Sequence, residues 1–291
     1  MVGSTLIKTS TPTGFGWQRD LPDAHDVSIQ DPWFASRLSK LPRLVELPTS
    51  VDWRTYCGAV DDQGDFNTSP AHACAGLLQF CERRAHGRVI EPSRMFLYRT
   101  ARRLDRFSND SGVSLRSVLK AMVRFGVASE SSWPFLPGNL NLDPDAFVYS
   151  EAKQDENAVY VRLDHSDQSG ESKLTIVKSF LACGFSIVFG FPVYDSVTQS
   201  PDIAFPSQMN RVLGGQSVLA VGYADDRRYR SDHGAILIRN SWGPSWGDAG
   251  YGWLPYEYVR RHLAADFWLL LRESWLASSE FLMPEMLADL G

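Results

Sequence analysis

A run of tryptophan and glycine residues near residue 245 constrains the fold more than any other segment of this chain. It reads Asn-Ser-Trp-Gly-Pro-Ser-Trp-Gly over residues 240–247 and continues as Gly-Tyr-Gly over residues 250–252. Tryptophan and glycine steps at such fixed spacing rarely recur by chance. The preceding residues, 235–239, are apolar and strand-sized, so Asn240 is expected at the end of a strand.

Helical patterns come first along the chain and strand patterns follow. An i, i+3, i+4, i+7 stripe of Cys74, Leu77, Leu78 and Cys81 predicts a helix over residues 70–86, with Ser69 as its N-cap. We also predict helices at 94–103, 114–125 and about 172–183, a loop at 137–157, strands at 185–189, 217–223, 235–239 and 267–271, and a turn at 225–228. This order indicates an α+β fold with an antiparallel sheet or barrel.

Composition divides the chain into regions. Residues 1–49, rich in Pro, Ser, Thr and Asp, are expected to form an extended arm that wraps the body. Residues 50–150 should form a mainly helical lobe and residues 151–275 a mainly β lobe. The apolar tail at 276–291 either packs back on the body or docks on a partner.

Charge and composition exclude several classes of function. The formal net charge is -5 without a dense Lys/Arg block, which argues against nucleic acid or an anionic membrane as partner. No apolar run is long enough to span a bilayer and the start lacks a signal-peptide core, so we expect a cytoplasmic protein. No cofactor or metal motif is found, and the four cysteines are expected to be buried free thiols.

Several separated segments resemble the papain-like (C1) cysteine peptidases, and together they cover nearly the whole chain. The segments are Val51-Asp52-Trp53-Arg54, Val60 to Gly64, Ser69-Pro70-Ala71, Asp110-Ser111-Gly112, Trp133-Pro134-Phe135, Gly214 to Val218 and the tryptophan–glycine run. Phe15-Gly16-Trp17 resembles the arm of bacterial members. The resemblance implies a two-lobed fold, a helical lobe and a β-barrel-like lobe separated by a cleft.

The resemblance also assigns a site, but two residues depart from the family pattern. Ser69 stands where the family has its nucleophilic cysteine, and Gln216 where it has the histidine base. Asn240 matches the asparagine that orients the histidine, and Gln63 the oxyanion glutamine. Gly112, Trp242 and Gly215 are the implied substrate-binding residues.

These replacements remove the usual chemistry. A serine hydroxyl is far less acidic than a thiol and needs a base to take its proton. The neutral amide of Gln216 cannot serve as that base. Gln216 could instead hydrogen-bond Asn240 or Ser69 and keep the shape of the cleft, and Ser69 could act only as a helix cap.

Other residues could in principle replace the missing pair. His72 follows Ser69 on the same helix face, and His233 precedes the strand that ends at Asn240. We expect His72 to face the interior and His233 to lie on the surface. Cys74 does not share the helix face of Ser69 and is a poor candidate for a displaced nucleophile.

Three functions remain open. The first is a pseudopeptidase without proteolytic activity, whose cleft binds a peptide, acyl group or small molecule. The second is an enzyme repurposed for cyclisation or acyl rearrangement in a biosynthetic pathway, with Gln63 and the Ser69 N–H as oxyanion donors. A weak serine-dependent hydrolase is the least favoured. In either leading case we expect the cleft to bind a carbonyl group.

Overall fold

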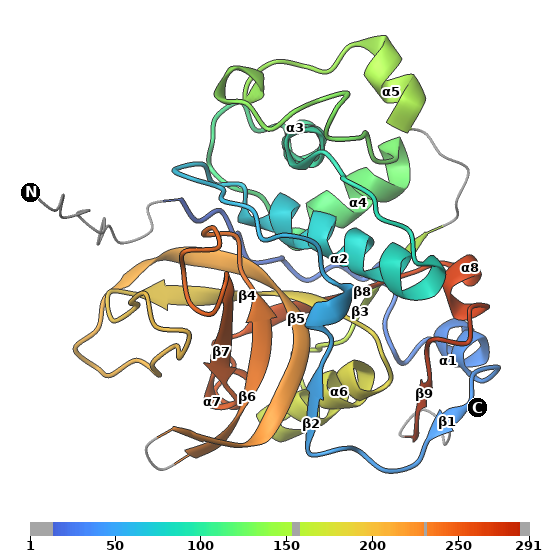
Figure 1. Cartoon of the computed structure of the whole chain (residues 1–291), viewed down its shortest axis with the longest axis vertical. Helices are drawn as coiled ribbons and strands as arrows, with labels where there is room; N and C mark the ends of the chain where they lie inside the picture. Colours follow the sequence, from blue (N-terminus) through green and yellow to red (C-terminus); the bar gives the residue numbers. More distant parts are fainter. Residues whose placement is uncertain (1–13, 153–157, 230–231, 286–291) are drawn as a thin grey trace, which may run out of the picture.

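A computed structural model describes residues 14–152, 158–229 and 232–285. The helices α2–α5 lie on one side of the molecule and most of the strands on the other (Figure 1). The helices are α1 (Pro32–Leu38), α2 (Ser69–His86), α3 (Arg94–Leu104), α4 (Leu115–Phe125), α5 (Ala146–Ala152), α6 (Gly170–Ala182), α7 (Glu257–Arg260) and α8 (Glu273–Leu276), with 3-10 turns at Arg54–Tyr56 and Pro137–Asn139.

The strands are β1 (Arg43–Leu44), β2 (Ser50–Asp52), β3 (Val159–Arg162), β4 (Ile187–Tyr194), β5 (Val212–Tyr229), β6 (Asp232–Arg239), β7 (Tyr251–Pro255), β8 (Ala265–Leu271) and β9 (Met283–Pro284). The main sheet has the order β3-β8-β4-β5-β6-β7, with β2 added on β5, and its pairings are antiparallel. The predicted α+β class is confirmed.

Helix α2 is the central helix of the molecule. Its residues from Ser69 to Glu82 are buried, as expected for a helix that packs on all sides. Gly87 ends it with φ 66°, as predicted, and donates its N–H to Arg83 O and Glu82 O. The predicted N-cap is wrong: Ser69 is the first helical residue and no side chain caps this end. The Ser69 hydroxyl is engaged elsewhere, in the cleft.

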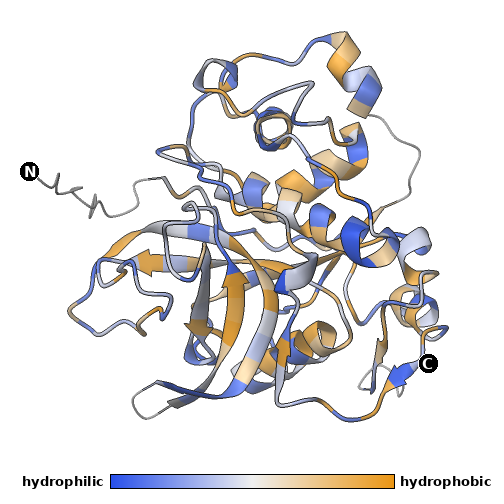
Figure 2. Ribbon diagram, viewed as in Figure 1, coloured by the Kyte–Doolittle hydropathy of each residue, from blue (hydrophilic) through white to orange (hydrophobic). Residues whose placement is uncertain are grey.

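Buried hydrophobic residues of β4, β5, β6 and β8 form the core of the sheet. Figure 2, coloured by residue hydropathy, shows orange segments along its strands. Strand β5 is long enough to pair with β4, β6 and β2 along its length. Its register places Gln216 opposite Phe191 and Gly215 opposite Pro192. The neighbouring Ser217 donates its N–H to the Ser69 hydroxyl, so this part of β5 lies beside the N-terminus of α2.

Two local predictions are wrong. Residues 137–152 are not all loop, because Asp145 accepts the Val148 N–H at 3.0 Å and starts α5, which buries Val148 and Ala152; residues 153–157 of that predicted loop lie outside the described residues. Residues 225–228 do not form a turn, because β5 continues to Tyr229 through a register shift between Ala224 and Arg228. The predicted arm also contains a short helix, α1.

The described part of the C-terminal tail packs back on the body. Strand β9 pairs with β1 in parallel, the Leu282 N–H donates to Cys183 O at 2.9 Å, and Phe281 and Met283 are buried. All four cysteines are buried free thiols. Within the described ranges, every helix is too short or too polar to cross a lipid bilayer.

Candidate ligand-binding cleft

The four residues predicted for the catalytic positions come together between α2 and the sheet. Gln63 precedes α2, Ser69 begins it, Gln216 lies on β5 and Asn240 follows β6. Gln216 Nε2 lies 3.0 Å from Gln63 Oε1 and 2.8 Å from Asn240 Oδ1. The Ser69 hydroxyl accepts the Ser217 N–H at 3.1 Å. All four side chains are buried.

An amide network holds Gln216 in place. Its Nε2 also lies 3.2 Å from the Ser241 hydroxyl, which donates to Gln63 Oε1 at 2.6 Å. Asn240 Oδ1 also accepts the Ser241 N–H at 2.9 Å. Gln216 therefore faces more acceptors than it has N–H groups, and its orientation is fixed by amide hydrogen bonds rather than by a charge.

Two hydrogen-bond donors of the site converge on one carbonyl oxygen from the chain's own arm. Gln63 Nε2 donates to Phe15 O at 2.9 Å, and the Ser69 N–H donates to the same oxygen at 3.2 Å. The Phe15 N–H is satisfied as well, because it donates to Asn67 Oδ1 at 3.2 Å. Both main-chain groups of Phe15 are thus held by residues that surround the N-terminus of α2.

The following residues of the arm continue through the space between the helices and the sheet. We call residues 14–20 the arm segment; it runs between α2–α4 and β4–β5 (Figure 1). Val113 pairs with it from the helical side, donating its N–H to Gly16 O at 3.0 Å and accepting the Gln18 N–H at 3.1 Å. From the sheet side, Gly215 O accepts the Trp17 N–H at 2.9 Å. The segment is hydrogen-bonded on both sides.

Glycines on both partners make this close approach possible. Gly16 has φ +117°, and a Cβ there would overlap the Asn67 backbone. A Cβ at Gly112 would overlap Gly16 O, and one at Gly190 or Gly215 would overlap the Trp17 side chain or backbone. Gly112 and Gly215, two of the predicted substrate-binding residues, therefore border the arm segment.

Trp242, the third of them, packs against Trp246 with ring centroids 5.1 Å apart in a T-shaped arrangement. It is buried, and its backbone bridges to Asp62 in the loop that carries Gln63. It follows Asn240 and Ser241 directly in the sequence. Trp242 therefore joins the residues after β6 to the loop that carries Gln63.

The candidate replacement groups do not contact Ser69. His72 is buried against Phe135, its Nδ1 lies 3.1 Å from Thr68 O, and burial lowers its pKa to about 4. His233 is exposed on β6. Burial raises the pKa of the Cys74 thiol. Among the described residues, no titratable side chain has a hydrogen bond to Ser69 or Gln216.

Sequence reasoning missed several residues that build the site. Ser241 joins Gln63 to Gln216, Asn67 holds the Phe15 N–H, and Asp266 Oδ2 accepts the Trp17 indole N–H at 3.0 Å. The alternation of glycine and aromatic residues in Gly14-Phe15-Gly16-Trp17 was the available signal. It indicates backbone that must approach another surface closely.

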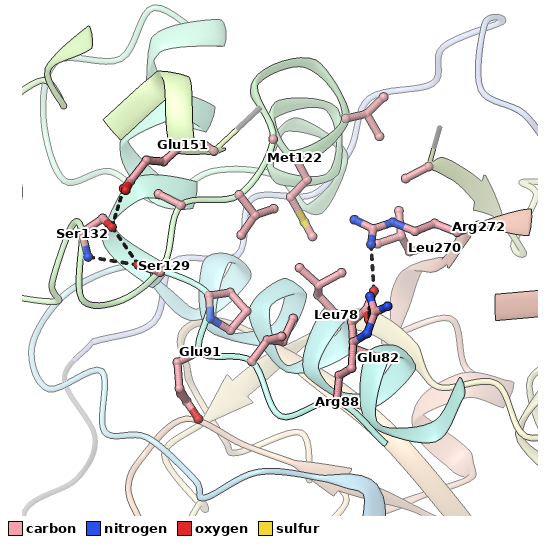
Figure 3. Close-up of a pocket in the computed structure, with 18 of the residues that line it drawn as sticks. Leu78, Glu82, Arg88, Glu91, Met122, Ser129, Ser132, Glu151, Leu270 and Arg272 are labelled. Atoms are coloured by element: carbon pink, nitrogen blue, oxygen red, sulfur yellow. Dashed lines mark hydrogen bonds and ion pairs between the residues drawn. The ribbon is translucent and has the colours of Figure 1, made fainter. Parts of the chain in front are cut away.

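A separate cavity lies at the other end of α2. Its volume is about 760 Å³, and Leu78 and Glu82 of α2 and Met122 of α4 line it. Figure 3 shows Arg272 bonded to Glu82 on one side and Ser132 bonded to Glu151 on the other. None of the predicted site residues lines this cavity. In the described part of the chain, no three His, Cys, Asp or Glu side chains are grouped to hold a metal ion.

The fold and the matched motifs define the class of the protein. The family described as "Papain family cysteine protease" matches residues 47–262. The chain belongs to this family, as its resemblance to the C1 peptidases predicted.

Two of its relatives match over almost their whole length. An uncharacterized peptidase C1-like protein of Acanthamoeba polyphaga mimivirus is 30% identical, over 91% of this chain and 89% of its own. The crystal structure of xylellain, a cysteine protease from Xylella fastidiosa, is 31% identical, covers 91% of this chain and 98% of its own, and has a TM-score of 0.73. The oryzain gamma chain of Oryza sativa is 25% identical, and the match spans only 54% of that protein.

Proposed function

We propose that this chain is a papain-family protein that does not cleave peptides, and that its cleft binds a peptide segment. In this structure that segment is the arm segment of the same chain. The observation that carries the proposal is the Phe15 carbonyl oxygen, which accepts hydrogen bonds from Gln63 Nε2 at 2.9 Å and from the Ser69 N–H at 3.2 Å. The centre binds a peptide carbonyl with main-chain and amide donors, and both are uncharged.

The replaced pair supports the loss of proteolysis. Ser69 and Gln216 stand at the positions of the family's nucleophile and base, and their side chains bond to Ser217, Gln63, Asn240 and Ser241. A neutral amide has no titratable proton near pH 7 and cannot act as the base. Serine without a base is a poor nucleophile. Removing nucleophile or base from such a unit costs orders of magnitude in rate.

We therefore expect no cleavage of general peptide substrates and no covalent labelling of the cleft by thiol-directed inhibitors. Fluorogenic peptides and intact-mass analysis after exposure to an epoxide inhibitor would measure both, with an active papain-family peptidase as positive control. Ser69→Ala is the matched variant, and it should behave like the unmodified protein. Cleavage that disappears in Ser69→Ala would overturn the proposal.

Restoring the family residues is expected to return only weak activity. The double variant Ser69→Cys, Gln216→His regains a thiol and an imidazole, and a nearby imidazolium and helix N-terminus lower a thiol pKa from about 8.5. The arm segment still fills the cleft, and Asn67, Thr68 and Pro70 still differ from the family pattern. The measurement is kcat/KM on a fluorogenic peptide, with each single variant as control. Activity equal to that of an active family member would contradict the proposal that the arm segment blocks the cleft.

A second function is favoured by the same pair of donors. Two N–H groups that converge on one carbonyl oxygen also match the requirement for stabilising a developing oxyanion. If the arm segment leaves, a substrate carbonyl could take the place of Phe15 O, and the site would act as a repurposed enzyme for acyl rearrangement or cyclisation. The Gln63 variants considered in the Discussion separate this function from peptide binding.

A further inference from the structure

Beyond the cleft, the arm is anchored in a buried cluster of charged side chains that the proposed function does not use. The cluster joins the arm to α4, to β3 and the residues after it, to α6 and to β8. Its carboxylates are Asp20, Asp26, Asp164 and Asp266, and its cations are Arg116, Arg162 and Lys173.

Asp266 is the residue of this cluster that binds the arm segment. Its Oδ2 accepts the Trp17 indole N–H at 3.0 Å and the Asp20 N–H at 2.9 Å. Its Oδ1 accepts from Arg162 Nη2 at 2.9 Å. Asp266 has φ +59°, in the left-handed region, and Asp164 holds its backbone by accepting the Asp266 N–H at 3.1 Å. The side chain is fully buried.

Asp20 brings a second fully buried carboxylate beside Asp266. Its Oδ2 accepts the Trp268 indole N–H at 2.9 Å. The nearest cation is distant for an ion pair, because Arg116 Nη1 lies 3.9 Å from Asp20 Oδ1 and Arg116 binds Asp26 at 2.5 Å instead. Docking of the arm therefore places the Asp20 carboxyl group, out of water, in the cluster that contains Asp266.

The cluster holds one more carboxylate than cations, four against three. A buried charge without a partner is costly unless a proton neutralises it. The other ionisable groups that face the cluster are Cys74 on α2, Tyr160 on β3, His262 before β8, and Arg19 and Asp23 on the arm. Arg19 is exposed, so it does not neutralise the buried excess.

We propose that the arm is held in the cleft by a proton-dependent latch, in which the Asp20 and Asp266 carboxyl groups together keep one proton while the arm is docked and both ionise when it leaves. The latch rests on the proposed occupancy of the cleft by the arm segment. It makes the cleft most tightly closed at acidic pH and opens it as the pH rises.

The direction follows from proton linkage. Burial, followed by the charge of Asp20, raises the pKa of Asp266 from 3.8 to about 7, and burial also raises the pKa of Asp20. Below the ordinary carboxyl pKa of 3.8, the Asp266 carboxyl group is protonated whether the arm is docked or released. Between that value and about 7 only the docked form keeps its proton, so docking weakens by up to about tenfold per pH unit. Above that range the dependence levels off.

The test measures arm docking directly in the full-length protein. A nonspecific protease cuts the arm, and its rate at each pH is divided by its rate on a synthetic peptide with the sequence of residues 14–24. This ratio cancels the pH dependence of the protease.

We expect this cleavage ratio to rise by up to about tenfold per pH unit from about pH 5 to about pH 7. Asp20→Asn should reduce this slope, because it removes the charge of Asp20, which helps to raise the pKa of Asp266, and keeps an acceptor for Trp268.

Asp23→Asn is the matched control, since Asp23 lies on the same arm and is exposed; it should leave the slope unchanged. Protection of the arm that does not vary with pH would overturn the latch, but it would not contradict the occupancy of the cleft by the arm segment. A slope that is undiminished in Asp20→Asn would also overturn the latch. Cleavage as fast as that of the free peptide at every pH would instead overturn the occupancy of the cleft.

Discussion

Gly16→Ala is expected to reduce the free energy of unfolding by about 2–4 kcal/mol, or to expel the arm segment from the cleft. Gly16 has φ +117°, which L residues rarely adopt, and a Cβ there would overlap the backbone of Asn67. The Asn67 backbone cannot yield easily, because its N–H donates to Asp110 and its side chain donates to Asp110 O. Urea unfolding gives the change.

Gly64→Ala is the matched control for this prediction. Gly64 also has positive φ, at +58°, but a Cβ there would meet no atom within 4 Å. The free energy of unfolding of Gly64→Ala should fall by only about 1–2 kcal/mol, which is the cost of placing an L residue in the left-handed region. An equal loss in the two variants would contradict the close packing of the arm segment on Asn67.

The same experiment compares the docking free energy of the arm with the strain that Gly16→Ala introduces. If the strain at residue 16 exceeds the docking free energy, the arm leaves and the remaining body keeps its stability. The protease ratio then rises toward that of the free peptide while the main unfolding transition stays in place. In that variant Ser69 and Gln216 become accessible, so Gly16→Ala is also the background in which added peptides can be tested for binding.

The resemblance to the papain-like peptidases predicted which residues form the candidate site, and local signals predicted the elements that carry them. Pro70 and Gly87 delimit α2, and this sets where Ser69 lies. The apolar run before Asn240 predicts β6. These signals need only local backbone geometry and the pattern of burial.

The occupant of the site could not be predicted in the same way. The arm segment is held largely through main-chain groups of Phe15, Gly16 and Trp17, which every residue carries. The glycines of this segment indicate a close backbone approach, but no side-chain pattern identifies the surface that is approached. The same limit applies to the charged cluster, because Asp20 and Asp266 are 246 positions apart. Nothing local to either residue indicates that they meet.

Gln63 is the residue whose replacement best separates the two candidate functions, and it must be replaced with care. Its Nε2 donates to Phe15 O and Phe66 O, and its Oε1 accepts from Gln216 and Ser241. Gln63→Ala removes all of these hydrogen bonds, and each buried group that it leaves without any partner costs about 1–3 kcal/mol. Gln63→Glu keeps the shape and the acceptor but removes the donors, so the two variants are measured together.

In a site that only binds, removing the Gln63 donor should weaken docking of the arm by roughly twofold to twelvefold, the equivalent of about 0.5–1.5 kcal/mol. The Ser69 N–H still holds the Phe15 carbonyl in this case. In a working oxyanion site the same change should slow the reaction by several hundredfold, about 3–4 kcal/mol in the barrier, because the lost bond strengthens as charge develops on the oxygen.

The Gln63→Glu variant also predicts the direction in which stability changes with pH. The carboxylate that it introduces would face the Phe15 and Phe66 carbonyl oxygens, so the pKa of this new carboxyl group should rise in the folded protein. The loss of stability relative to the unmodified protein is then small below about pH 4 and grows as the pH increases. Urea unfolding of both proteins across this range measures it. If neither variant changes arm docking, stability or any turnover, Gln63 does not hold a carbonyl group, and both proposed uses of the cleft are excluded.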